Sequence, residues 1–505
     1  MDVVFWNSTP AKFPFTRYIG PYKIAHWIRK SGYDCQVIDF IQNLSTSELY
    51  NATEKFITPK TKILGISTTF LCSHDYVWPD GSIHRFPKHL VDTLRLIKQQ
   101  YPNIKVILGG YISDKIYMDG LIDATIMSYV SASEDIFLEY LEHLIKGTPL
   151  PFGTLLTSFI GSGNQQCKTR MFFNSARNPK YNIETDDFKF IKRDVILSGE
   201  PLPLDISRGC IFACRFCQYP HLGKKKLDYI RGMEFIQEEI LYNHETFNTK
   251  NYYILDDTFN DTEWKIKEFY NITEKLPFDI NYVAYLRADL LHRFPDTAHQ
   301  LKESGLFGAY HGLESLHPYA SNLVGKSWSG KKARDYIPKL YHDIWKGEVP
   351  QHLNFIVGLP KETKDDIIST VDWFKSNKLY NINFNNLILF EKGNEKTSYS
   401  IDSEFGKNAE KYGFEFVDGI GGKLKNKSWI NETWTEPEAM KFSEEINISC
   451  IDFKKVQVFK LLPLLFLGFT KEYLTSTKNS KYNWKKISHM ENLKTKEYYE
   501  KLMNV

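Results

Sequence analysis

Three closely spaced cysteines constrain this chain more than any other feature. Cys210, Cys214 and Cys217 follow the spacing C-x-x-x-C-x-x-C within residues 207–217. Thiolates this close in one loop can converge on a single metal centre, and soft sulfur ligands favour iron–sulfur clusters or zinc. A closed zinc site needs four protein ligands, and a cuboidal iron–sulfur cluster is usually held by four cysteines. Three thiolates therefore leave one metal corner open, where a small molecule can bind.

A zinc knuckle is the alternative. His221 follows closely enough to be a fourth ligand, which would make the chain a metal-stabilised, non-catalytic binding protein. Zinc knuckles usually pair one C-x-x-C with a second, and this sequence has no second pair. The other cysteines are scattered singly, which argues against a disulfide framework and indicates a reducing cytosol; they are Cys35, Cys72, Cys167 and Cys450.

Chain length, net charge and the apolar stretches limit which classes of protein this chain can belong to. The 505 residues allow two or three domains, each with its own core. The net charge of +3 is too small to indicate a nucleic-acid partner. Residues 1–6 show no signal-peptide pattern, and the longest apolar stretch, residues 461–469, is roughly half of what a bilayer span needs. The sequence therefore predicts a cytoplasmic protein with no membrane attachment.

Residues 1–147 alternate short apolar runs with helical patterns. The runs are 2–6, 35–40, 62–67, 104–108 and 122–127, and the helical patterns are 22–30, 47–56, 90–100 and 134–146. This order predicts a doubly wound parallel sheet with helices on both faces. A ligand of such a sheet binds at the carboxyl ends of the strands. Those ends carry Ser67, Thr68, Gly109 and Gly110, and the glycines allow a flat ligand to approach the backbone.

A second strand–helix series follows an irregular connection at residues 148–200. In residues 201–390 the expected strands are 203–207, 252–256, 280–286, 307–313, 352–358 and 382–390, and the expected helices are 228–243, 263–275, 295–304, 330–346 and 363–377. Six such units predict a partial (β/α)6 barrel with its site on the loops after the strands. Residues 391–505 are expected to form a mostly helical C-terminal region, with a helix at 436–467 and a surface loop at 413–427.

Polar and glycine residues stand at successive strand ends of this barrel: Asp256 and Asp257, Arg287, Glu314, and Gly358. Arg287 could bind a carboxylate bidentately. Each has a structural explanation by itself, such as a helix cap for Asp257, a surface ion pair for Arg287 or a turn at Gly358. Their joint occurrence at consecutive strand ends is more typical of a binding site.

The cysteine loop after the first strand, with Phe216 before the third cysteine, resembles that of the radical S-adenosylmethionine (SAM) enzymes. Further segments are similar to the subgroup with an N-terminal cobalamin-binding-like domain: S-R-G-C at 207–210, D-D-x-F at 256–259, G-x-E-S at 312–315, G-L-P-x-E-T at 358–363, and "LGIST" and "VILGGYIS" near the N-terminus. The resemblance implies that the three cysteines bind a 4Fe–4S cluster and that Phe216 lies near the adenine of SAM. It also implies that Glu314 and Asp256 contact SAM, although strand alternation leaves open whether Asp256 or Asp257 faces inward.

The implied reaction begins with an electron from a donor such as flavodoxin or ferredoxin. The cluster then cleaves SAM to a 5′-deoxyadenosyl radical, which abstracts hydrogen from an unactivated carbon, and methylcobalamin delivers a methyl group. The D-x-H-x-x-G motif of cobalamin-binding proteins is absent, so we expect cobalamin without a lower histidine ligand, with His74 or His84 as weak substitutes. The alternative is a cofactor-free N-terminal domain and a radical rearrangement, oxidation or sulfur insertion. The substrate, a small molecule or a peptide, cannot be read from the sequence.

Overall fold

A computed structural model describes most of the chain: residues 1–8, 15–69, 71, 76–77, 83–84, 86–110, 120–126, 133–158, 169–173, 175–177, 179–217, 229–326, 328–391, 403–418, 427–476 and 482–505. His74 and His221, both named above as candidate ligands, lie outside these residues. No helix in the described part is long and apolar enough to span a membrane.

The first sheet has the strand order β2-β1-β3-β6-β7-β9-β8. All neighbouring strands pair in parallel except β8 and β9, which are antiparallel. The strands are β1 (Val3–Trp6), β2 (Cys35–Ile38), β3 (Ile63–Ser67), β6 (Lys105–Gly109), β7 (Ala124–Ile126), β8 (Leu155–Ser158) and β9 (Thr169–Phe173). The doubly wound parallel sheet is confirmed. Strands β8 and β9 extend it into residues that we had assigned to the connection.

Helices cover both faces of this sheet. On one face α1 (Gly20–Lys30) packs beside α4 (Ser133–Lys146), and on the other α2 (Thr46–Phe56) packs beside α3 (Lys88–Gln100). Strand β1 lies between β2 and β3 and is buried on both faces. Its Val3 and Phe5 join the core under α1 and α4, whereas Val4 and Trp6 join the core under α2 and α3. This explains why the strand reads as a continuous apolar run.

The second sheet consists of six parallel strands in sequential order, β10 to β15. They are β10 (Leu202–Leu204), β11 (Asn251–Ile254), β12 (Asn281–Leu286), β13 (Leu306–Glu314), β14 (Gln351–Val357) and β15 (Ile382–Asn386). The helices along them are α5 (Met233–Phe247), α6 (Glu263–Thr273), α7 (Ala288–Arg293), α8 (Pro295–Glu303), α9 (Pro318–Leu323), α10 (Gly330–Lys339) and α11 (Lys364–Ser376). The partial (β/α)6 barrel is confirmed.

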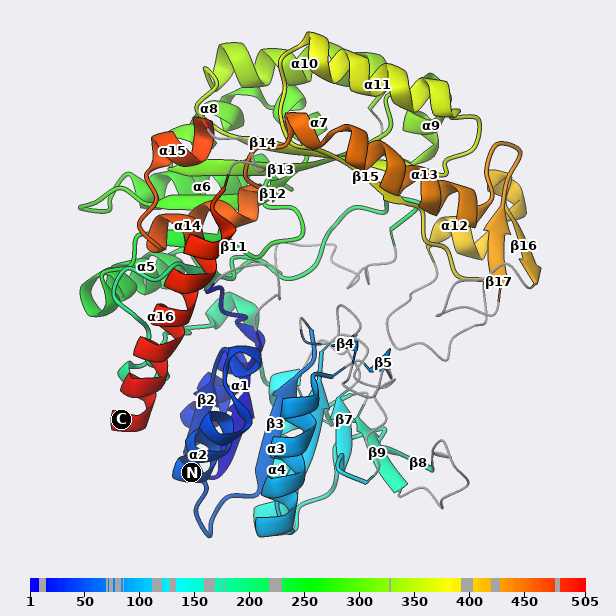
Figure 1. Cartoon of the computed structure of the whole chain (residues 1–505). Helices are drawn as coiled ribbons and strands as arrows, with labels where there is room; N and C mark the ends of the chain where they lie inside the picture. Colours follow the sequence, from blue (N-terminus) through cyan, green and yellow to red (C-terminus); the bar gives the residue numbers. More distant parts are fainter. Residues whose placement is uncertain are drawn as a thin grey trace.

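The carboxyl edges of the two sheets face each other. In Figure 1 the first sheet lies below the barrel. Glu134, at the start of α4, forms a 2.8 Å ion pair with Arg208, which lies just after β10. Nearby, the fully buried guanidinium of Arg17 contacts Asp39 of the first sheet and Glu200 just before the barrel. These ion pairs therefore hold the first sheet against both ends of β10, since Glu200 precedes this strand and Arg208 follows it.

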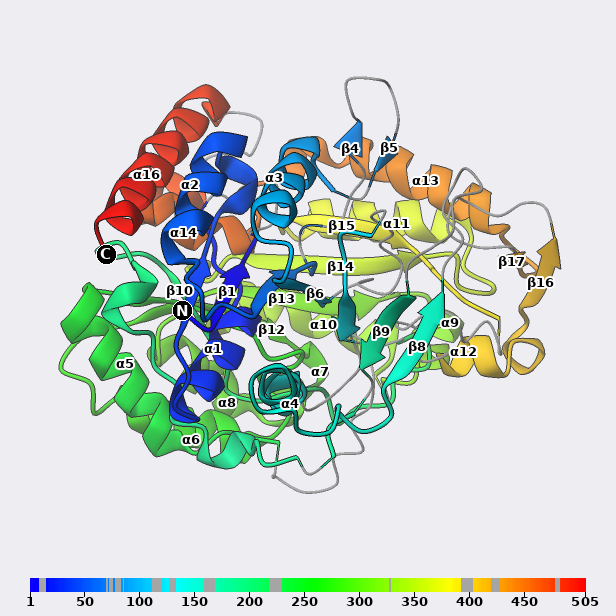
Figure 2. The ribbon, with the colours of Figure 1, turned by 90° about the horizontal axis from the view of Figure 1, so that it is seen from below.

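The C-terminal region covers the barrel and reaches back to the first sheet. Its elements are α12 (Glu404–Lys407), β16 (Glu415–Asp418), β17 (Lys427–Ile430), α13 (Glu436–Ser449), α14 (Leu461–Phe466), α15 (Lys471–Ser476) and α16 (Trp484–Asn504). Helix α13 lies along β15, and α16 lies beside α2, as Figures 1 and 2 both show. The Tyr498 hydroxyl of α16 accepts a 2.8 Å hydrogen bond from the Asp39 backbone.

Two predictions for this region are wrong. The expected helix 436–467 ends at Ser449, because Asn381 of the barrel binds the carbonyls of Phe453 and Val456, each at 3.2 Å. The expected loop 413–427 contains β16 and the start of β17, which pair as an antiparallel hairpin. Its Trp429 is fully buried against the barrel, a tertiary contact that local composition does not reveal.

Candidate active site

The three cysteines lie in the loop between β10 and α5. All three cysteines stand outside any disulfide and are half-buried. The start of this loop is fixed by Asp256, which is fully buried. Its carboxylate accepts hydrogen bonds from the Ser207 backbone at 2.9 Å and the Ser207 hydroxyl at 2.5 Å. The ammonium of Lys265 on α6 pairs with the same carboxylate at 2.9 Å.

The spacing of the thiols argues against a mononuclear zinc site. Four ligands around one zinc at a Zn–S distance of 2.3 Å have sulfurs about 3.8 Å apart. Among the described residues, one trio of metal-ligating side chains has its ligand atoms within 4.8 Å of one another, and it is His26, Asp186 and Asp187. At least one pair of the three cysteine sulfurs is therefore more than 4.8 Å apart. An iron–sulfur cluster fits this wider spacing, because each thiolate binds a different iron.

The close approach of His26, Asp186 and Asp187 is explained by two neighbouring lysines. Lys23 pairs with Asp186 at 2.5 Å, and Lys30 pairs with Asp187 at 2.7 Å. Burial lowers the pKa of His26, so its ring is neutral at pH 7. Because both carboxylates already have a cationic partner, this cluster is explained without a metal.

Two cations lie close to Cys214. The Arg287 guanidinium lies 3.6 Å from its sulfur, and Lys326 acts on it electrostatically. Burial raises the pKa of the Cys214 thiol, and both cations oppose that shift. Positive charge beside the sulfur favours the thiolate that an iron ligand requires. On the other side, Cys210 lies 3.5 Å from the Thr258 hydroxyl.

Arg287 already has a carboxylate partner. Its Nε and Nη2 bind Asp289 at 3.0 Å and 2.6 Å, and its guanidinium lies 4.0 Å from the centre of the Phe212 ring. The two guanidinium nitrogens that could bind a carboxylate side by side are therefore already bound to Asp289. The predicted bidentate contact of Arg287 with a SAM carboxylate therefore requires the guanidinium to leave Asp289.

Glu314 ends β13 in a backbone conformation that is uncommon for a non-glycine residue, with φ of 67°. Its carboxylate pairs with Lys326 at 2.6 Å, and the same ammonium donates to the Gly312 carbonyl at 2.7 Å. A Cβ atom at Gly312 would lie 2.4 Å from the Glu314 carboxylate, which explains the glycine of the G-x-E-S segment. Sequence reasoning missed Lys326, because only the fold brings it to the cysteine loop.

The remaining barrel candidates have distinct positions. Asp256 is buried below the cysteine loop, and Asp257 is half-buried with electrostatic contacts to Tyr18 and Tyr285. Phe216 is half-buried against the barrel core. Gly358 has φ of 110°, and a Cβ atom there would lie 2.5 Å from the Trp429 ring. The C-terminal hairpin therefore packs on Gly358, which gives this glycine a structural role, and its predicted contact with a cofactor stays a prediction.

The strand-end residues of the first sheet meet each other as expected. The Thr68 backbone donates to the Gly109 carbonyl at 2.8 Å, and Gly110 has φ of 107°. Tyr18 connects this edge with the barrel. Its hydroxyl forms a hydrogen bond with Thr69, and it interacts electrostatically with Arg208 and Asp257. The Tyr18 pKa is raised by burial. His84, in the short hairpin β4 (Tyr76–Val77) and β5 (Ile83–His84), is half-buried.

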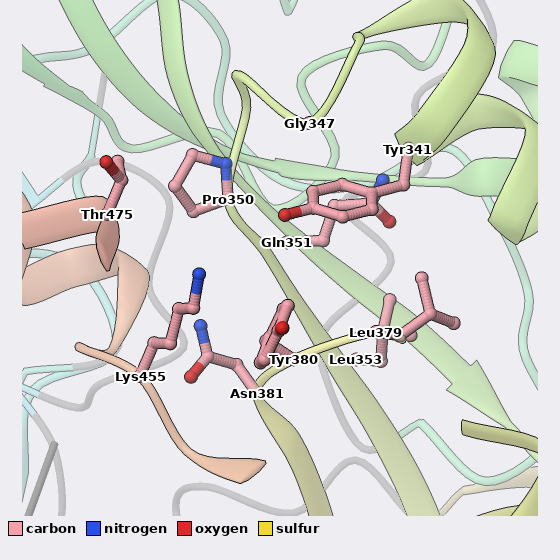
Figure 3. A pocket seen from close by; sticks show the side chains of 10 residues that line it. All are labelled: Tyr341, Gly347, Pro350, Gln351, Leu353, Leu379, Tyr380, Asn381, Lys455 and Thr475. Atoms are coloured by element: carbon pink, nitrogen blue, oxygen red, sulfur yellow. The ribbon is translucent and has the colours of Figure 1, made fainter. Parts of the chain in front are cut away.

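A small pocket lies at the opposite edge of the barrel. It has a volume of about 20 Å³ and is lined by residues that precede β14 and β15, among them Pro350, Tyr380 and Asn381, together with Lys455 (Figure 3). These residues stand at the amino ends of the strands, whereas the cysteine loop stands at the carboxyl ends. The pocket is therefore separate from the cysteine site.

Comparisons with known proteins agree with this site. Residues 204–374 match the family model of the Radical SAM superfamily. An uncharacterized methyltransferase of Pyrococcus horikoshii is 24% identical over 368 residues, which cover 71% of this chain and 72% of the relative. A bacteriochlorophyllide d C-8(2)-methyltransferase of Chlorobaculum tepidum is 23% identical over 203 residues, 38% of this chain and 43% of its own length.

Two solved structures share the fold. The radical SAM methyltransferase TsrM from Kitasatospora setae has a TM-score of 0.58 at 13% identity, and the match covers 98% of this chain and 99% of that chain. The cobalamin-dependent SAM radical enzyme OxsB has a TM-score of 0.55 at 16% identity. That match covers 82% of this chain but only 56% of OxsB.

The cysteine loop at the carboxyl edge of a partial barrel, together with the family match over that barrel, makes this chain a radical SAM enzyme. The cofactors of this superfamily are a 4Fe–4S cluster and SAM. The superfamily chemistry also requires a reductant.

Proposed function

We propose that this enzyme is a cobalamin-dependent radical SAM methyltransferase that methylates an unactivated carbon. The observation that carries the proposal is the orientation of the two sheets. The strand ends of the first sheet and the cysteine loop lie on either side of Tyr18, and Arg208 of the loop pairs with Glu134 of the first sheet. A ligand bound at Ser67, Thr68, Gly109 and Gly110 would therefore face the cysteine loop.

The comparisons support the same proposal. OxsB has a structure with aqua-cobalamin bound and TsrM one with cobalamin and a 4Fe–4S cluster bound, and the two relatives described above are named methyltransferases. We assign residues 1–147 to the cobalamin-binding domain, 148–200 to the connection, 201–390 to the radical SAM barrel, and 391–505 to a C-terminal cap. Because β8 and β9 continue the first sheet, we place the functional end of that domain near Phe173.

Each part of the chain has a proposed task. Cys210, Cys214 and Cys217 hold the cluster, which together with SAM and cobalamin supplies the radical and methyl-transfer chemistry. Asp256 and Lys265 fix the cysteine loop, and Glu314 with Lys326 binds the polar part of SAM, which carries both an amino and a carboxylate group. Phe216 packs against the adenine.

We propose flavodoxin or ferredoxin as the class of electron donor and the cytoplasm as the compartment. With no lower histidine identified, the first sheet would hold the corrin by its backbone edge and surrounding side chains. Gly109 suits this task, because no heavy atom of the described residues lies within 4 Å of the place where its Cβ would be.

Product analysis tests the proposal. Anaerobically reconstituted enzyme is incubated with SAM and dithionite, with and without hydroxocobalamin, and 5′-deoxyadenosine and S-adenosylhomocysteine are quantified. We expect 5′-deoxyadenosine to depend on the cluster and S-adenosylhomocysteine to depend on added cobalamin. If S-adenosylhomocysteine does not respond to cobalamin, methyl transfer is wrong and the cobalamin-free radical reaction takes its place.

A further inference from the structure

The inner face of the barrel sheet changes in character along its strands. Near the amino ends, the inner residues Tyr253 and Val283 are buried under Val458 and Leu461 of the C-terminal region. Closer to the carboxyl ends, most inner positions hold aromatic and amide side chains, and Ile356 of β14 is an apolar exception. We call this set the amide–aromatic row; it consists of Tyr285, Tyr310, His352, Asn354, Asn383 and Asn385.

The strand register places these residues on one face. Tyr285 pairs with Tyr310 across β12 and β13, and Tyr310 pairs with His352 across β13 and β14. Asn354 then pairs with Asn383 across β14 and β15, and Asn385 follows two residues later on the same face. With neighbouring strands about 4.8 Å apart, the row spans about 14 Å from β12 to β15.

The aromatic half of the row is a continuous stack. The ring centres of Tyr285 and Tyr310 are 4.9 Å apart, and those of Tyr310 and His352 are 4.6 Å apart with an interplanar angle of 8°. Phe459 lies against both tyrosines, with ring centres 4.7 Å and 5.4 Å away. These contacts fix the orientation of the rings, which lowers the entropy cost of stacking a further ring on them.

The amide half is linked by hydrogen bonds. The Asn354 side-chain oxygen accepts from the amide of Asn383 at 3.5 Å and from that of Asn385 at 3.3 Å. Asn383 also donates to the Asn385 oxygen at 2.9 Å. Carboxamides offer both donors and acceptors, so the linked group can bind a ligand edge that carries both.

Packing alone does not explain the row. Barrel interiors are mostly filled by branched aliphatic side chains, and side chains that only fill space are buried. Tyr285 is 40% exposed and Asn385 is exposed, whereas Tyr253 and Val283, on the same face nearer the amino ends, are at most 4% exposed. The two ends of the row, Tyr285 and Asn385, are thus accessible.

The row carries no net charge. Burial lowers the pKa of His352 to about 3, so its imidazole is neutral at pH 7. The nearby ions Glu314 and Lys326 neutralise each other. Asp257, which follows β11, interacts electrostatically with Tyr285. Asp257 and Arg208 of the cysteine loop both act on Tyr18 as well. Lys454 is a further cation that acts on His352, and its ammonium binds the Asn447 side-chain oxygen at 3.3 Å. A charged ligand group buried against Asn383 and Asn385 would have no ionic partner among the residues of the row itself, which costs free energy.

We propose that the amide–aromatic row is the substrate subsite, and that the substrate presents to it an uncharged aromatic or heteroaromatic ring bearing an amide-type hydrogen-bonding edge. The ring stacks on Tyr285 and Tyr310, and the donor–acceptor edge meets Asn383 and Asn385. This inference rests on the proposed function, because it takes the barrel interior beside the cysteine loop as the reaction chamber.

Three probes of similar shape test the charge preference. Benzamide is neutral, benzoate is an anion and benzylamine is a cation. Their dissociation constants for the cluster-reconstituted full-length enzyme are measured by saturation-transfer difference NMR. We expect benzamide to bind at least 5-fold more tightly than either charged probe, and Asn385→Leu and Tyr285→Leu to weaken benzamide at least 5-fold. Asn51→Leu, an exposed asparagine on α2, is the matched control and leaves it unchanged.

A charge swap provides the second variant. Asn385→Asp places a carboxylate in the row and is expected to improve benzylamine binding at least 3-fold. Equal binding of the three probes, or benzamide binding that none of the three row variants changes, would overturn the subsite. Reductive SAM cleavage is measured on the wild type and Asn51→Leu samples. If these fail to cleave SAM, the proposed function fails; if they cleave it and the probe pattern is absent, only the subsite fails.

Discussion

Ser315 donates a 2.5 Å hydrogen bond to the buried carboxyl group of Glu362. This contact joins the G-x-E-S segment after β13 to the G-L-P-x-E-T segment after β14. The Glu362 backbone carbonyl in turn accepts from the Trp434 indole at 2.6 Å. The two segments therefore form one structural unit behind Glu314, which explains why both occur in the chain without requiring every residue in them to bind a cofactor.

The first prediction concerns this carboxyl group. Burial raises the pKa of Glu362 from about 4.5 to about 8. The folded protein therefore keeps a proton that the unfolded chain loses, and stability falls as pH rises through this window and levels off above it. At about 1.4 kcal/mol per pKa unit, we expect Glu362 to account for a loss on the order of 2–4 kcal/mol between pH 5 and pH 8.

Urea unfolding of Glu362→Gln at both pH values measures this effect. The amide resembles the protonated carboxyl and keeps an acceptor for Ser315, so the variant should lose less stability on going to pH 8 than the wild type. Glu432→Gln, at an exposed position, is the control. An unchanged pH dependence in Glu362→Gln would mean that Glu362 is ionised in the folded protein.

The second prediction concerns the support of the cysteine loop. Asp256→Asn leaves Lys265 without one of its two carboxylates and replaces an acceptor for Ser207 with a donor-bearing amide. Breaking a buried pair of this kind costs about 3–5 kcal/mol. We expect lower thermal stability together with fewer irons bound per chain after reconstitution. Asp296→Asn, on the exposed first turn of α8, should bind the wild-type amount of iron. Full iron content in Asp256→Asn would limit Asp256 to a purely structural role.

The third prediction concerns SAM. Glu314→Gln removes the ionised acceptor at the end of β13, and hydrogen bonds to a charged group are stronger than those to a neutral amide. If the carboxylate contacts SAM directly, the variant should retain its cluster but lose about 1.5–3 kcal/mol of SAM binding. Equilibrium dialysis with labelled SAM provides the measurement. Glu391→Gln disrupts a comparable lysine pair elsewhere, with Lys427 at 2.8 Å, and should bind SAM normally. If the SAM affinity of Glu314→Gln is unaltered, Glu314 does not contact SAM, and its role is limited to the ion pair with Lys326.

The fourth prediction concerns Gly358. An alanine there must tolerate both a φ of 110° and a Cβ atom 2.5 Å from the Trp429 ring. Gly413 has a φ of 79° with no atom within 4 Å of its Cβ position, so Gly413→Ala carries the backbone strain alone, about 1–3 kcal/mol. Gly358→Ala should be more destabilising than Gly413→Ala in chemical denaturation. Adding Trp429→Leu should reduce the difference. Equal effects of the two alanines would show that the hairpin can move away from Gly358.

Much of the fold could be predicted because both sheets are built from local signals. Apolar runs at 62–67 and 280–286 became β3 and β12 within one residue. Strand β3 is buried along its whole length, and burial on both faces favours a continuous apolar run. The hairpin around Trp429 and the break after Ser449 could not be predicted, because both depend on contacts with the barrel.

In the candidate site, too, features set by local sequence could be predicted and features set by tertiary contacts could not. The cysteines stand in one loop, so their spacing alone pointed to a shared centre. Lys326 and Lys265 have no motif that marks them, and only the fold brings them to the cysteine loop. Strand alternation could not decide between Asp256 and Asp257 either, because both follow the end of β11, where the regular alternation stops.

Metal analysis tests the central claim most directly. The enzyme is reconstituted anaerobically with iron, sulfide and hydroxocobalamin, and passed through gel filtration. Iron, sulfide, cobalt and zinc are then quantified in the folded fraction, beside Cys214→Ala and the control Cys450→Ala. We predict about four irons and four sulfides per chain for one 4Fe–4S cluster, with one cobalt co-eluting in the wild type and the control. Cluster iron should be lost in Cys214→Ala. Zinc in place of iron would contradict the radical SAM assignment, and a cluster-loaded protein without cobalt would contradict cobalamin-dependent methyl transfer.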